Sequence, residues 1–149
     1  MVNFIDNETP LSAENLNKLQ SDLEKYIEEK INGSVLFEAE SGETGVSGTV
    51  TLSDVVSNYD YLEITYIDNV GAQATVKYIP EISEFVNLTI IAIDNATTLF
   101  IKNRQCVVSG NTIANKSNSI NAEMSLTSTT QSVYQLENAI KIIKVVGYK

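Results

Sequence analysis

Residues 48–69, GTVTLSDVVSNYDYLEITYIDN, contain two β-strand patterns separated by a short polar segment. In YLEITYI (61–67) apolar and polar side chains alternate, which predicts a strand with one buried face. One face would carry Leu62, Ile64 and Tyr66, and the opposite face Tyr61, Glu63 and Thr65. TVTL (49–52) reads as another strand, and SDVVSN (53–58) between the two strands reads as an elbow. The stretch therefore predicts a strand, an elbow and a second, half-buried strand.

The rest of the chain after residue 33 shows the same period of two. Further strands are predicted at 34–40, 74–79, 86–94, 98–110 and 138–149, with turns at 68–73 and 95–97. SGETGVSG reads as a flexible loop, and the Asn- and Ser-rich tract 110–123 as a polar surface loop, with a variable binding loop as the alternative. Seven or eight short strands at this spacing predict a mainly β fold, an antiparallel, jelly-roll-like β-sandwich.

One helix is predicted before the strands, over residues 10–32, so that 1–33 forms a helical segment and 34–149 the sandwich domain. Ser12 is the expected N-cap, and Gly33 stands where a helix commonly ends in a left-handed conformation. The apolar residues recur with helical spacing on one narrow stripe: Leu16, Leu19, Leu23, Tyr26, Ile27 and Ile31.

This stripe has two interpretations. In one, the leucines of the helix pack against the chain's own β-domain. In the other it is a short trimeric coiled-coil stalk, with Leu16 and Leu23 at a positions, Leu19 and Tyr26 at d positions and Lys30 at the next a. Such a stalk spans under three heptads, so the following domain would also have to oligomerise. The predicted oligomer interface is Leu16, Leu19, Leu23, Tyr26 and Ile27.

Composition limits the function. The 149 residues suit one domain, and the net charge of −9 would repel a phosphate backbone, so nucleic acid is not an expected partner. The first residues lack the basic and apolar regions of a secretory signal, and no apolar run is long enough to cross a bilayer. We expect synthesis in the cytoplasm without export, and no membrane insertion.

The sequence predicts no catalytic, cofactor-binding or metal-binding residues. The chain has no histidine, which excludes Ser–His and Cys–His nucleophiles and the common zinc sites. Its single cysteine, Cys106, lies in an apolar strand and reads as a buried, inert side chain. Two acid pairs, Glu38 with Glu40 and Glu81 with Glu84, are the remaining route to catalysis, as in a glycan depolymerase. An ordinary solvated face explains them more simply.

Three segments resemble tail fibre and receptor-binding proteins of phages and prophages of Gram-positive bacteria. FIDNETPLSAENLNKLQSDLEKYI (4–27) resembles their helix-opening amino-terminal segment, through Phe4, Asp6, Thr9, Pro10, Leu11, Ala13, Leu16 and Asn17. GTVTLSDVVSNYDYLEITY (48–66) resembles a module of the same proteins, and IKIIKVVGYK (140–149) their closing strand. Together these segments cover about a third of the chain, in the order found in the family.

The resemblance implies a non-enzymatic component of the virion tail, a homotrimer that contacts other tail or baseplate proteins and binds a saccharide on the host surface. Two alternatives remain: a purely structural tail protein without its own receptor, and a small glycan depolymerase. The ligand-binding residues are unknown; Tyr61 and the tract 110–123 are guesses. Segment 81–137 matches no motif of the family, and recognition would vary there.

Overall fold

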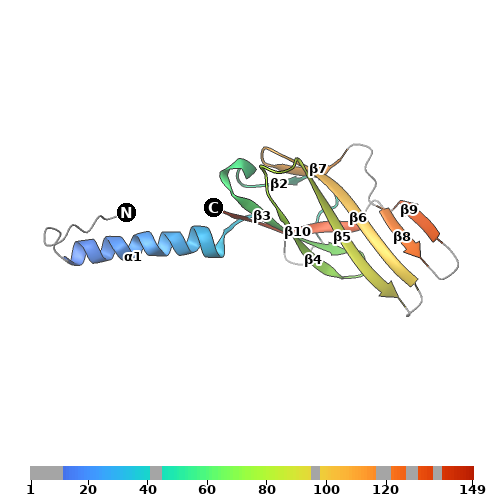
Figure 1. Cartoon of the computed structure of the whole chain (residues 1–149), viewed down its shortest axis with the longest axis horizontal. Helices are drawn as coiled ribbons and strands as arrows, with labels where there is room; N and C mark the ends of the chain where they lie inside the picture. The colour runs from blue at the N-terminus through green and yellow to red at the C-terminus, as the bar shows by residue number, and fades with distance from the viewer. Residues whose placement is uncertain (1–11, 41–44, 95–97, 117–121, 127–130, 136–138) are drawn as a thin grey trace.

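The chain forms one N-terminal helix followed by two antiparallel β-sheets that face one another in a sandwich-like arrangement (Figure 1). This computed structural model describes residues 12–40, 45–94, 98–116, 122–126, 131–135 and 139–149, and only the backbone of 94, 122–126 and 131–135. The predicted mainly β fold with a leading helix is confirmed. The predicted turn 95–97 lies outside the described residues.

Helix α1 (Ala13–Ile27) begins where the sequence predicts and changes character near its end. The Ser12 side chain accepts a hydrogen bond from the Asn15 N–H at 3.2 Å, which satisfies one of the free N–H groups of the first turn. From Glu28 the helix continues as the π-helical turn η1 (Glu28–Asn32), and Gly33 ends it with φ 68°. The helix bounds predicted as 10–32 are thus close to those observed.

The first sheet has four strands in the order β1-β10-β3-β4. They span Ser34–Glu38 (β1), Ile140–Tyr148 (β10), Tyr61–Asp68 (β3) and Gln73–Tyr78 (β4). Burial alternates along the whole of β3, with Leu62, Ile64 and Tyr66 inside, as the sequence predicts. The elbow before β3 contains the 3-10 turn η2 (Val56–Asn58), whose Val56 is buried.

The second sheet is built around the long strand β6 (Thr98–Ser109). Its other strands are β2 (Val50–Thr51), β7 (Thr112–Asn115), β8 (Ala122–Leu126), β9 (Gln131–Gln135) and β5 (Phe85–Asp94). Strand β5 pairs with β6 over ten residues and forms an edge of the sheet. Most of segment 81–137, for which the sequence offered no motif, therefore belongs to this sheet.

The prediction of a surface loop over 110–123 is wrong for much of that tract. Strand β7 pairs with residues 106–109 of β6, and β8 begins at Ala122 and pairs with residues 99–103. Residues 117–121, between them, lie outside the described residues. Strand β9, which the sequence did not predict, follows β8, so the described residues contain ten strands rather than seven or eight. Polar strands form here because β5 covers only one edge of β6, and successive parts of the other edge pair with β7 and β8.

The core fills the space between the two sheets. Its fully buried side chains come from both layers, and include Leu62, Ile64, Leu88, Ile113, Ile140, Ile142 and Val145. Cys106 is among them, so the predicted burial of the thiol is confirmed. Of the charged side chains that the structure describes, three are buried with these apolar residues: Asp68, Lys102 and Arg104.

Candidate functional site

The apolar stripe of α1 is exposed along its whole length. No residue of the helix is buried, and the exposed fraction of the predicted interface side chains runs from 38% at Ile27 to 58% at Tyr26. Figure 1 shows the helix pointing away from the sandwich, beyond the end where β10 finishes. The structure thus does not support the interpretation in which the chain's own β-domain buries these leucines.

A compact joint connects the helix to the sandwich. A Cβ atom at Gly33 would lie 2.6 Å from Val146 Cγ1 and 2.8 Å from a ring carbon of Tyr148, so only glycine allows the backbone this close to β10. The Lys149 N–H donates to the Glu29 carbonyl at 3.4 Å. The helix therefore leaves the domain from a point fixed by the last strand.

Lys30 does not continue the heptad pattern of the helix. Its Nζ lies 3.6 Å from Asp60 Oδ2, on the residue just before β3. The π-helical turn that contains Lys30 also shifts the phase of the side chains relative to α1. The usable apolar seam consequently ends near Tyr26 and Ile27, about where α1 itself ends.

Tyr61 is not free to receive a ligand on its ring. The ring of Tyr148 on β10 stacks on it with centroids 4.7 Å apart, and Lys77 Nζ on β4 lies 3.5 Å from its centroid. Strand β3 runs between β10 and β4, so the two neighbours approach from opposite sides. The Tyr148 hydroxyl is held in turn by Glu63 at 3.2 Å. This arrangement stabilises the sheet and leaves Tyr61 a poor stacking platform.

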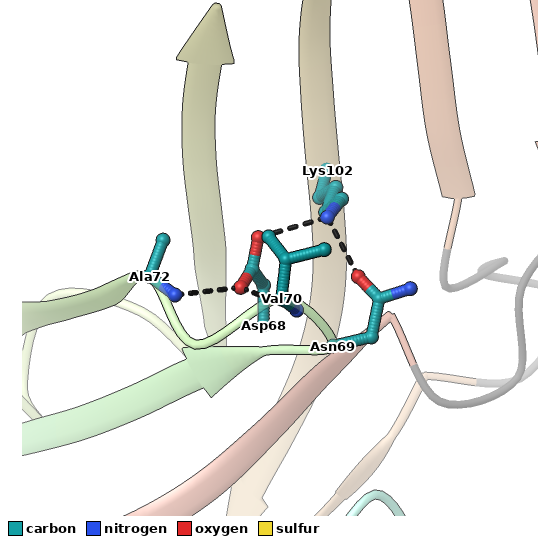
Figure 2. Close-up of polar contacts among 5 residues, drawn as sticks. All are labelled: Asp68, Asn69, Val70, Ala72 and Lys102. Carbon is teal, nitrogen blue, oxygen red and sulfur yellow. Dashed lines mark hydrogen bonds and ion pairs between the residues drawn. The ribbon is translucent and has the colours of Figure 1, made fainter. Parts of the chain in front are cut away.

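A buried ion pair joins the two sheets (Figure 2). Lys102 Nζ on β6 donates to Asp68 Oδ2 on β3 at 2.8 Å and to Asn69 Oδ1 at 2.6 Å. The other carboxylate oxygen of Asp68 accepts the N–H groups of Val70 and Ala72 at 3.0 and 2.8 Å. Burial opposes ionisation of Asp68, but the hydrogen bonds from Lys102 and the two N–H groups outweigh it and lower the pKa of the carboxyl.

Arg104 forms a second polar connection between the layers. Its guanidinium donates to the carbonyls of Val46, Gly48 and Ile140 at 2.9, 2.6 and 3.3 Å, and its Nε donates to Asn115 Oδ1 at 2.7 Å. The side chain is only 1% exposed, and burial lowers its pKa. Because its donors are used within the fold, Arg104 acts as a structural tie and not as an anion receptor.

Cys106 lies two residues along β6 from Arg104, on the same inward face. Burial raises the pKa of the Cys106 thiol, and the nearby guanidinium only partly opposes this. A buried thiol with a raised pKa is a weak nucleophile.

The acid pairs predicted for glycan hydrolysis are exposed. Glu38 forms an ion pair with Lys144 on the neighbouring strand at 3.2 Å, an ordinary surface contact. Glu40, Glu81 and Glu84 are also exposed. Neither pair is buried, so both fit an ordinary solvated surface.

The described residues hold no group of three or more metal-ligating acids and thiols, and no helix there is long and apolar enough to cross a bilayer. No protein-family model matches the chain, and no curated protein is detectably similar to it. The candidate functional surface that stands out is therefore the exposed stripe of α1.

Proposed function

We propose that this protein is a non-enzymatic component of a phage or prophage tail, that it self-associates through α1, and that it binds a saccharide on the host surface. The observation that carries the proposal is the exposed stripe of Leu16, Leu19, Leu23, Tyr26 and Ile27 on a helix that projects from its own domain. The resemblance of three sequence segments to tail fibre proteins supplies the biological setting.

A lone helix of this kind is unfavourable in water. A single helix of 15 residues is marginal without packing partners. Each apolar side chain that a partner removes from water contributes about 25 cal/mol per Å². Leucines with heptad spacing pack best against the same spacing, so further copies of this chain are the natural partners. The resemblance favours three copies.

The seam is too short to hold three chains by itself, since it runs only from Leu16 to Ile27. The sandwich must add contacts between copies. Exposed apolar side chains suited to such contacts occur on β5, where Ile91 and Ile93 are 64% and 73% exposed. A trimer assembled in this way presents three copies of any weak binding site, and such multivalency raises avidity by about 10²–10⁴.

The same proposal has a structural alternative, a tail or baseplate protein without its own receptor. The experiment that separates the two is sedimentation of the purified protein with cell walls from a panel of Gram-positive bacteria. A receptor-binding protein is retained by the walls of its host, whereas a purely structural part is retained by none. Release of reducing sugar from the walls, lost on Glu38→Gln or Glu81→Gln, would instead support a depolymerase.

A further inference from the structure

We propose that a hollow beside the elbow of η2 is a binding site for an uncharged carbohydrate; this inference rests on the proposed function and gives it a location. The hollow has a volume of about 480 Å³, within the range of small-molecule sites. It is lined by Ser57, Asn58, Tyr59, Asp60, Pro80 and Glu81. Ser57 and Asn58 belong to η2, Tyr59 and Asp60 connect η2 to β3, and Pro80 and Glu81 lie in the turn after β4.

The elbow wall is held rigid by Asp54. Its Oδ1 accepts the Val55 N–H at 2.7 Å and the Asn58 amide at 2.9 Å, and its Oδ2 accepts the Tyr59 hydroxyl at 3.0 Å. Hydrogen bonds from the Asn58 side chain, the Val55 N–H and Tyr59 lower the pKa of Asp54. The carboxylate thus stays ionised at neutral pH and keeps the elbow in one conformation.

The remaining walls are fixed by backbone contacts. The Asp60 N–H donates to the Tyr148 carbonyl at 2.7 Å, and the Val56 N–H donates to the Gly110 carbonyl at 2.9 Å. The opposite turn is closed by the Ile82 N–H, which donates to the Ile79 carbonyl at 3.1 Å. A ligand would therefore meet a preformed site, and little conformational freedom would be lost on binding.

The lining selects the chemical class of the ligand. Two carboxylates, Asp60 and Glu81, accept hydrogen bonds, and Ser57 can both donate and accept. Sugar hydroxyls also donate and accept, so they match this set. A phosphate-bearing polymer would face the Asp60 and Glu81 carboxylates. Two cations lie beside the hollow but do not line it: Lys30, 3.6 Å from Asp60, and Lys149, whose Nζ lies 5.7 Å from the centre of the Tyr59 ring. An apolar ligand would leave the polar groups without partners.

The test is an amide NMR titration of the full chain with three probes: methyl glucopyranoside, methyl N-acetylglucosaminide and glycerol phosphate. We expect at least one neutral glycoside to shift the amides of Ser57, Asn58, Asp60 and Glu81. Glu81→Gln should weaken that binding by about tenfold, because a hydrogen bond to a charged carboxylate is replaced by one to a neutral amide. Glu84→Gln, an exposed glutamate outside the hollow, is the matched control and should leave binding unchanged.

Shifts confined to other surfaces, equal shifts with glycerol phosphate, or no shifts with any probe would overturn the inference. The wall-sedimentation experiment separates this failure from failure of the proposed function. If the protein binds walls and Glu81→Gln binds them equally well, the hollow is not the site but receptor binding stands. If the protein binds no walls while a glycoside still shifts the hollow, the carbohydrate site stands and the receptor role fails.

Discussion

The Tyr66 hydroxyl serves both backbone groups of Thr89 on the facing sheet: it donates to the Thr89 carbonyl at 3.0 Å and accepts the Thr89 N–H at 3.1 Å. Thr89 lies on the edge strand β5, so these groups point away from β6. One buried tyrosine therefore blocks part of a sheet edge that would otherwise invite pairing with another strand. The Ser83 hydroxyl likewise accepts the Phe85 N–H at 2.9 Å and donates to the Phe85 carbonyl at 3.0 Å.

Removal of that hydroxyl should destabilise the sandwich. In Tyr66→Phe the ring still fills the core, but the N–H and carbonyl of Thr89 lose their partner, which costs about 1–3 kcal/mol. Urea denaturation measures the free energy of unfolding. Tyr61→Phe, on the outer face of the same strand, should change it by less than about 0.5 kcal/mol. Equal effects of the two variants would show that the contact across the sheets is unimportant.

The Asp68–Lys102 pair should be costly to break from one side. Lys102→Met leaves the Asp68 carboxylate buried without its cation, and we expect a loss of about 3–5 kcal/mol. Asp68→Asn combined with Lys102→Met should cost less than the sum of the two single changes. Chemical denaturation of all three variants checks this; additive costs would contradict the direct coupling between the two side chains.

The same pair predicts a pH dependence. The pKa of Asp68 is lower in the folded chain than the roughly 3.9 of an unfolded aspartate, so its ionised form stabilises the fold above that pH. The contribution declines as pH falls below about 4, toward the lower folded-state pKa. Asp68→Asn should therefore flatten the acid limb of a stability curve, whereas Asp22→Asn on the exposed helix should not. An unchanged acid limb in Asp68→Asn would contradict the stabilising role of the ionised Asp68 carboxylate.

Gly147 on β10 should tolerate no side chain. A Cβ there would lie 2.5 Å from the ring of Tyr59, which lines the hollow, whereas a Cβ at Gly48 meets nothing within 4 Å. Gly147→Ala should lower the melting temperature through overpacking of about 1–3 kcal/mol. Gly48→Ala is the control with the same added methyl group and should melt close to the parent. Similar melting of both variants would contradict the close packing.

Much of the scaffold could be predicted because it depends on local patterns. The alternation in 61–67 predicted β3 and its buried face. Ser12 and Gly33 indicated the two ends of the helical segment. Strand β7 could not be read in the same way, because TIAN is short and polar and becomes a strand only by pairing with β6. A local sequence pattern does not show which strand a short segment will pair with.

The buried cations and the hollow were missed for a similar reason. Lys102 and Arg104 stand in a strand as ordinary charged residues, and the partners Asp68, Asn69 and Asn115 lie at least 11 positions away in sequence. Residues 57–60 and 80–81 meet only after β3 and β4 have paired. The helix stripe was visible in the sequence, but only the structure shows that the chain's own domain leaves it exposed.

Self-association through α1 is the central claim, and light scattering of the purified full chain tests it most directly. We predict a mass close to three times 16.4 kDa, which falls to that of one chain in the double variant Leu19→Asp, Leu23→Asp. The control Asn17→Asp, Ser21→Asp adds the same charge on the other face of the helix and should remain trimeric. A parent protein with the mass of a single chain would contradict the account.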